Sequence, residues 1–151
     1  MTIQPNLIAG EWVTADDAID DINPSDLSDV VGRFSRGTAA DVDRAVDAAR
    51  GAQRAWAAVA LDDRARIMER IGNEIFDRRE ELGTLLAREE GKTRVEGIGE
   101  AARAASIFRF FAGEVLRPDG QVVPSVRPGI DVMVQREALG VIGVITPWNF
   151  P

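Results

Sequence analysis

The stretch ALGVIGVITPWNFP, residues 138–151, decides how this chain is interpreted. Residues 141–145 form a short apolar run rich in β-branched side chains, a pattern typical of a strand that is buried on both faces. Proline has no backbone donor, so the strand is expected to end near Pro147. The residues after it should then lie in a loop at the carboxyl end of a buried strand, where open α/β sheets bind ligands.

Asn149 and Trp148 in this loop each allow two interpretations. A carboxamide nitrogen offers two donors and stays neutral, so Asn149 could stabilise the negative charge that develops on a carbonyl oxygen under attack. Alternatively, the Asn149 side chain bonds its own loop, as Asn often does in turns flanked by proline. Trp148 could form the floor of a binding site or simply belong to the core. Taken alone, Asn149 favours the structural alternative.

Composition narrows the class of protein. The chain has 151 residues, of which 45% are hydrophobic and 28% charged, as in globular proteins. A net charge of -7 argues against nucleic-acid binding. The sequence contains no run of 18 apolar residues, so no membrane span is predicted. The chain contains neither Cys nor His, which excludes disulfides and argues against a zinc site or a His-based proton relay, so no metal is expected. Without a secretory signal in the first residues, a cytoplasmic location is expected.

The first 35 residues predict short strands with a structural role. Residues 6–13 predict two very short strands around a turn at Gly10, and residues 30–34 predict another. Residues 16–21 are acidic and predict a turn-prone stretch.

Four helices in series are predicted for the middle of the chain. Thr38 and Asp41 form a capping box that opens the first, and the second is expected to begin near Asp62. The third should end in a left-handed cap at Gly91, and the box of Thr93 and Glu96 opens the fourth.

The side chains of the fourth predicted helix are mostly small, which allows close packing against a neighbouring helix. Its aromatic residues favour a core position over a base-stacking platform: Phe108, Phe110 and Phe111. Glu89, Glu90 and Lys92 flank a helix end and are expected to be exposed and without a catalytic role. Residues 121–126 and 131–138 predict two extended segments joined across residues 127–130.

Several segments together resemble the aldehyde dehydrogenase superfamily. The PWNFP segment at residues 147–151 carries the resemblance most strongly, supported by GEW at residues 10–12 and NP at residues 23–24. Three further segments look most like bacterial α-ketoglutaric semialdehyde dehydrogenases: LAREEGKT at residues 86–93, EGIGE at residues 96–100 and VPSVRPGI at residues 123–130. The resemblance covers nearly the whole chain and identifies it with the amino-terminal portion of the family.

The resemblance implies an α/β fold and a domain plan. The chain would hold short β segments, a four-helix layer, an extended β arm and the first buried strand of a Rossmann-like sheet. Residues 1–117 would be the amino-terminal part of the cofactor-binding domain, and residues 118–139 an extended arm that pairs subunits of a homo-oligomer. Residues 140–151 would be the first strand and active-site loop of the cofactor-binding sheet.

The resemblance also implies a chemistry. Family members oxidise an aldehyde to a carboxylate with NAD or NADP, using a Cys nucleophile and a Glu base. Asn149 would be the catalytic residue of this chain, and the cofactor would lie along Ile145, Thr146, Pro147 and Trp148. The nucleophile, the base and most of the cofactor pocket are expected beyond Pro151, because a thiolate nucleophile has no substitute among the residues present. The chain alone is therefore expected to be inactive.

A non-enzymatic alternative is a helical interaction module that pairs with another chain through residues 118–139. An interaction module would not need the partial catalytic site at residues 147–151. The presence of this segment therefore favours the dehydrogenase.

We predict that residues 1–151, produced alone, form an oligomer or an aggregate. A normally central strand at residues 141–145 would lack its partners, and unpaired strand edges recruit other chains. Sedimentation and calorimetry test this prediction, and a monomer that melts cooperatively would contradict it.

Overall fold

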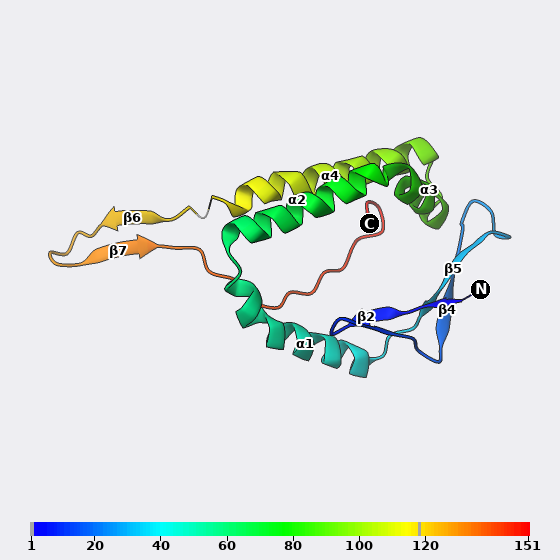
Figure 1. Cartoon of the computed structure of the whole chain (residues 1–151), viewed down its shortest axis with the longest axis horizontal. Helices are drawn as coiled ribbons and strands as arrows, with labels where there is room; N and C mark the ends of the chain where they lie inside the picture. Colours follow the sequence, from blue (N-terminus) through cyan, green and yellow to red (C-terminus); the bar gives the residue numbers. More distant parts are fainter. Residues whose placement is uncertain (1, 118) are drawn as a thin grey trace.

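A computed structural model of the chain describes residues 2–117 and 119–151 (Figure 1). The amino-terminal strands form two small sheets. β1 (Ile3–Gln4) runs parallel to β5 (Val30–Ser35), which pairs on its other edge with antiparallel β4 (Ala18–Ile22). β2 (Asn6–Ile8) and β3 (Glu11–Val13) form a separate hairpin.

The β2–β3 hairpin confirms the predicted turn at Gly10. Ala9 and Gly10 both have positive φ, 56° and 83°. Positive φ at both loop residues gives the backbone twist that matches the twist of the flanking strands.

The prediction of a turn over residues 16–21 is wrong, because most of this stretch belongs to β4. Its acidic composition suggested a loop. In the sheet, however, Asp20 lies opposite Arg33 of β5, and the two side chains form an ion pair at 2.6 Å. An opposite charge across the ladder compensates the low strand propensity of Asp.

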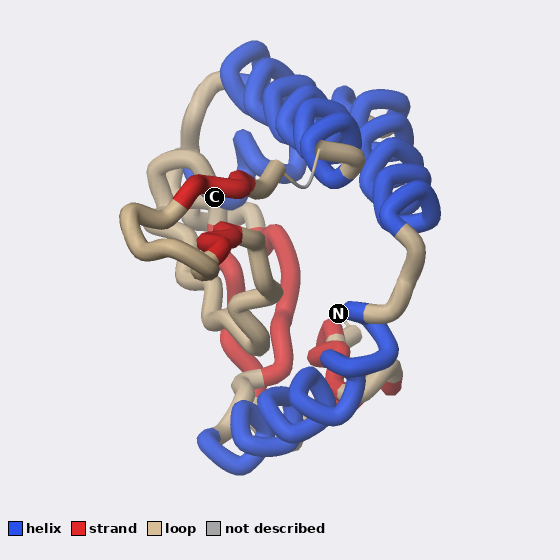
Figure 2. The backbone as a smooth tube through the Cα atoms, turned by 90° about the vertical axis from the view of Figure 1, so that its left-hand side faces the viewer, coloured by secondary structure: helices blue, strands red, loops and turns tan. Residues whose placement is uncertain are grey.

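The four predicted helices are confirmed, in the order α1 (Ala39–Ala57), α2 (Leu61–Asp77), α3 (Arg79–Glu90) and α4 (Arg94–Val115). Both predicted capping boxes form at the starts of α1 and α4, and Gly91 ends α3 with a φ of 79°. α2 and α4 lie side by side and antiparallel (Figure 1). Figure 2 shows α1 apart from this pair.

Small residues bring α4 very close to its neighbours, as predicted. Ala105 of α4 is fully buried, and its carbonyl oxygen lies 3.0 Å from the position that a Cβ on Gly72 of α2 would occupy. At the other contact, a methyl group on Gly97 of α4 would overlap the backbone of Gly83 in α3. The helical layer is therefore held by backbone-to-backbone approach.

The predicted core position of the α4 aromatic residues is wrong for Phe110 and Phe111. Phe110 is 63% exposed, and its ring meets that of Phe111 edge to face at 5.3 Å on the surface. α1 likewise buries none of its residues, although its apolar face follows the helical period. Periodicity predicted which faces are apolar. The described residues leave Phe110 and Phe111 exposed, and β2 and residues 140–142 approach α1 without burying any of its residues.

The two predicted extended segments form a hairpin that projects from the body (Figure 1). β6 (Gln121–Pro124) pairs with antiparallel β7 (Asp131–Val134), and every residue of both strands is exposed.

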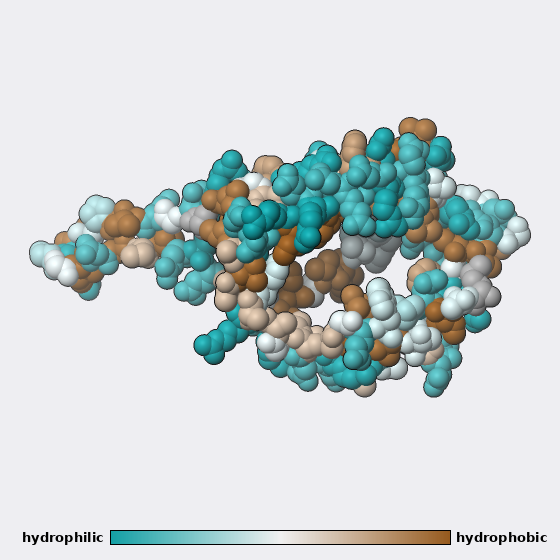
Figure 3. All heavy atoms as spheres, in the orientation of Figure 1, coloured by the Kyte–Doolittle hydropathy of each residue, from teal (hydrophilic) through white to brown (hydrophobic). Residues whose placement is uncertain are grey.

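The predicted buried strand at residues 141–145 is not formed. This segment is exposed, and Ile145 is 92% exposed. A strand exists only through its ladder, and no strand among residues 2–117 and 119–151 pairs with this one. In Figure 3 the molecule is hollow between α1 and the α2–α4 pair, and hydrophobic atoms are visible within the hollow.

One ion pair joins the strand region to the helical layer. Arg88 of α3 donates to both carboxylate oxygens of Asp29, at 2.9 and 2.6 Å, and Asn23 donates to the same carboxylate at 3.1 Å. The hydrogen bonds from Arg88 and Asn23 lower the pKa of Asp29 to about 2.

We predict that Asp29→Asn lowers the urea midpoint of the protein at neutral pH. A carboxylate with a depressed pKa stabilises the fold above its unfolded pKa of about 3.9, and this stabilisation is lost as the pH falls through the folded value. The gap between wild type and variant should therefore close between about pH 4 and pH 2. Asp47→Asn, at an exposed partner of Arg50 within α1, is the control. A gap that persists unchanged to pH 2 would contradict the assignment.

We predict that Gly97→Ala destabilises the protein by about 1–3 kcal/mol, the usual cost of overpacking. The added methyl group would have to push α4 away from Gly83. Gly51→Ala in α1 is the matched control, because a Cβ there meets nothing within 4 Å. The control should stabilise the helix by up to about 1 kcal/mol. Equal melting temperatures of the two variants would argue against the close contact.

Candidate functional site

The predicted site residues lie on the carboxyl-terminal segment, which runs between the α2–α4 pair and α1 (Figure 1). Ile145, Thr146, Pro147 and Trp148 are all exposed, and Trp148 is 80% exposed. Trp148 is thus not buried against the other described residues.

Trp148 gives the segment its sharp change of direction. Its φ is 47°, in the left-handed region that a bulky L-residue rarely adopts. Such a conformation costs on the order of 1–3 kcal/mol and persists only where the surroundings hold it. After this turn, Phe150 lies against α3 and α4.

Asn149 reaches a groove of about 540 Å³ along the first turns of α4. Among the residues that line it are Lys92, Gly99, Glu100, Arg103, Asn149 and Phe150. Among residues 2–117 and 119–151, no hydrogen bond engages the Asn149 carboxamide. The alternative in which this amide is saturated by its own loop is therefore not what the structure shows.

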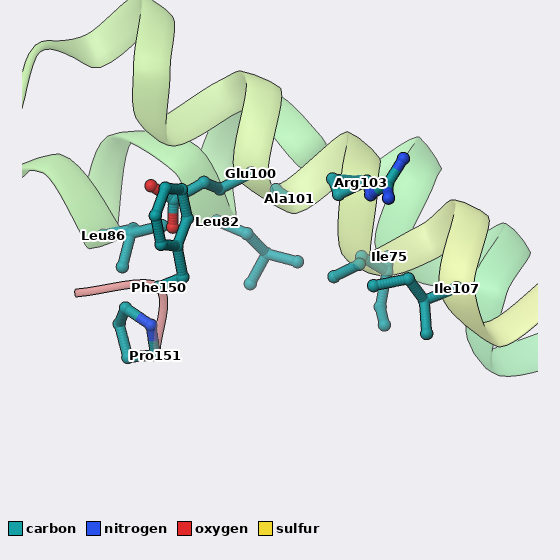
Figure 4. Close-up of a pocket in the computed structure, with 10 residues that line it drawn as sticks. Ile75, Leu82, Leu86, Glu100, Ala101, Arg103, Ile107, Phe150 and Pro151 are labelled. Carbon is teal, nitrogen blue, oxygen red and sulfur yellow. The ribbon is translucent and has the colours of Figure 1, made fainter. Parts of the chain in front are cut away.

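Phe150 also lines a second, more apolar groove of about 400 Å³. Figure 4 shows the Phe150 ring beside Glu100 and Leu86, while the guanidinium of Arg103 points away from it. Isoleucine and leucine side chains of α2, α3 and α4 form the apolar wall: Ile75, Leu82, Leu86 and Ile107. A site on this face could bind a small molecule with an apolar part near a neutral amide donor.

An ionic cluster beneath Phe150 was missed by the sequence analysis. Lys92 pairs with both Glu90 and Glu100, and only 14% of its side chain is exposed. The ammonium lies 5.3 Å from the centre of the Phe150 ring. Burial lowers the pKa of Lys92, but the hydrogen bonds to Glu100 and Glu90 outweigh it and the net shift is upward.

The expectation that Glu90 and Lys92 are exposed is therefore wrong, whereas Glu89 is exposed as expected. The left-handed cap at Gly91 reverses the chain and brings Lys92 back under α4, within reach of Glu100. Sequence spacing contains a weak signal for this, since Glu90 and Glu100 flank Lys92. It does not reveal that the three side chains meet.

A nicotinamide cofactor is compatible with residues 145–148 as one wall of a site. Ile145 and Trp148 present exposed apolar surface, which suits the face of a flat ring. Around these residues, the described part of the chain offers no His, Cys, Asp or Glu cluster for a metal. Among the described helices, none combines the length and the hydropathy that a membrane span requires.

The chain is similar to known proteins over almost its full length. The aldehyde dehydrogenase family model matches residues 12–151. The α-ketoglutaric semialdehyde dehydrogenase of Bacillus subtilis is 41% identical over 148 residues, which are 97% of this chain and 30% of that protein. The NADP(+) succinate-semialdehyde dehydrogenase GabD of Escherichia coli is 36% identical over 98% of this chain and 31% of its own length.

Solved structures give the same result. An NAD-dependent benzaldehyde dehydrogenase from Corynebacterium glutamicum superimposes with a TM-score of 0.89 at 38% identity, over 98% of this chain and 32% of that one. Betaine aldehyde dehydrogenase from Staphylococcus aureus, solved with NAD+, gives a TM-score of 0.90 at 32% identity, over 98% and 30%. The chain thus spans about 30% of the length of the relatives it matches.

Proposed function

This chain belongs to the aldehyde dehydrogenase family, and we propose that it is the amino-terminal part of an NAD(P)-dependent enzyme that oxidises an aldehyde to a carboxylate. The observation that carries the proposal is the Asn149 amide, which lies on a groove without a hydrogen bond from the described residues. A self-standing interaction module would explain the exposed β6–β7 hairpin, but it would leave this amide without a purpose.

Asn149 is the proposed donor to the aldehyde oxygen. When a nucleophile attacks the aldehyde carbon, negative charge develops on that oxygen, and a fixed amide N–H lowers the barrier by stabilising the charge. One such donor typically contributes about 3–4 kcal/mol. Because a carboxamide does not titrate, this contribution should be independent of pH.

Ile145, Thr146, Pro147 and Trp148 are the proposed wall of the cofactor site. The cofactor, when bound, would supply the acceptor for the hydride that leaves the aldehyde carbon. Relatives include an NAD-dependent and an NADP-dependent enzyme, so either cofactor is consistent with this chain. Residues 145–147 and Trp148 are all exposed, so they are the parts of this chain available to hold the nicotinamide end.

The proposed substrate class is an aldehyde that also carries an acid group, such as α-ketoglutaric semialdehyde. Support comes from relatives named for α-ketoglutaric semialdehyde at 41% and 34% identity. We assign residues 1–117 and 140–151 to the cofactor-binding domain and residues 118–139 to an arm for homo-oligomer formation. The fully exposed β6–β7 hairpin supports this arm. A cytoplasmic enzyme is proposed.

We predict that Asn149→Ala in the complete protein lowers kcat by about 10²–10³-fold. KM should change little, because the amide acts mainly on charge that is absent from the ground state. Aldehyde-dependent NAD(P)H formation, followed by absorbance, measures both constants.

Asn149→Asp tests the sign of the same interaction, since a carboxylate would repel the developing charge and should be at least as damaging. Asn73→Ala on α2 is the matched control, because Asn73 accepts a hydrogen bond from Arg109 outside the Asn149 groove. Unchanged turnover of Asn149→Ala would remove the assignment.

A further inference from the structure

Lys92 contacts the carboxyl-terminal loop at Phe150. This residue follows the left-handed cap at Gly91 and connects α3 to α4. Its ammonium is paired with Glu90 at the end of α3 and with Glu100 in the second turn of α4. Two carboxylates, one on each of the two helices, therefore fix this largely buried ammonium.

The Lys92 ammonium also interacts with an aromatic ring. Phe150 lies over it, with 5.3 Å from Nζ to the ring centre, within the range where a cation is attracted to an aromatic face. The two carboxylates hold the ammonium in place, so its position relative to the ring is set by α3 and α4. Phe150 is 72% exposed, and its ring otherwise lies beside Leu86 and Glu100 (Figure 4).

The loop around Phe150 needs such a restraint. The preceding Trp148 backbone is in the left-handed region, which is strained for a side chain of this size. Asn149 lies between the strained residue and the ring, in the same groove as Lys92. The orientation of the Asn149 amide therefore depends on how firmly Trp148 and Phe150 are held.

We propose that Lys92, held by Glu90 and Glu100, is a positioning residue that fixes Phe150 and thereby aims the Asn149 amide. This inference rests on the proposed function of Asn149. Two carboxylates against one ammonium leave the cluster with a net charge of -1, so Lys92 is not a docking cation for an acidic substrate. In this proposal the cluster acts through the loop, by fixing Phe150 beside Asn149.

The first test is a pair of variants in the complete protein. Phe150→Leu removes the ring and leaves the ionic cluster intact, and Lys92→Met removes the charge at similar side-chain length. Each should lower kcat by about 3- to 30-fold, the range that a cation–π contact of this kind supports, with KM for NAD(P) unchanged. Lys92→Arg, which keeps a cation over the ring, should recover most of the loss.

The decisive measurement is a double-mutant cycle with Asn149→Ala. If Lys92 and Phe150 act by aiming this amide, Phe150→Leu should change kcat less than about twofold once the amide is absent. A purely structural role would give the same fold-loss in both backgrounds. Arg94→Met is the matched control, because Arg94 is only two residues from Lys92 and its ion pair with Glu80 is exposed. The kcat of this variant should equal that of wild type.

The outcomes separate this inference from the function on which it rests. If Asn149→Ala leaves kcat unchanged, the proposed function fails. If Asn149→Ala lowers kcat but Phe150→Leu and Lys92→Met do not, only the positioning role is overturned. A rise in KM confined to acidic aldehydes in Lys92→Met would instead assign Lys92 to substrate binding and would overturn the proposal.

Discussion

The close approach of α4 to α2 and α3 is the constraint on which the rest of the structure depends. It is possible only because Gly72, Gly83, Gly97 and Ala105 remove side-chain bulk at the contacts. Backbones packed in this way have little freedom to slide, since interiors close-packed to this degree resist even one added methyl group. The first turns of α4, which form one side of the Asn149 groove, are thereby fixed relative to α3. The candidate site takes its shape from this helical contact.

Charges reinforce this arrangement to different degrees. Many ion pairs of the chain are exposed and lie within one helix, such as Arg66 with Asp62, and pairs of this kind contribute little to stability. Other ion pairs connect separate elements, and two sets of them lie at the end of α3. Arg88 ties α3 to the strand region through Asp29, and Lys92 ties α3 to α4 through Glu90 and Glu100. The second is well shielded from water and lies under the loop that carries Asn149, so it couples the rigid helical layer to the proposed chemistry.

Much apolar surface remains uncovered within the described residues. The core consists mainly of small side chains, and no large side chain among these residues is fully buried. The exposed surface includes one face of α1, the aromatic residues at the end of α4, the β6–β7 hairpin and residues 141–145. Contiguous apolar surface of this kind marks sites of contact with other parts of a protein or with other chains. The relatives that this chain matches are about three times as long.

The sequence by itself determined the local features: the helices, both capping boxes, the end of α3 at Gly91, the small-residue face of α4 and the Pro-Trp-Asn-Phe-Pro loop. These depend on interactions within a few residues, such as Thr38 with Asp41, so a linear pattern is sufficient to predict them. Only the tertiary structure decided what depends on distant partners. The acidic stretch at residues 18–22 became a strand because Arg33 lies across from Asp20, whereas residues 141–145 remained unpaired because no described strand lies beside them. Lys92 is largely buried because the cap at Gly91 turns the chain so that its side chain meets Glu100. Whether a charge can be buried depends on which opposite charges the fold brings within reach.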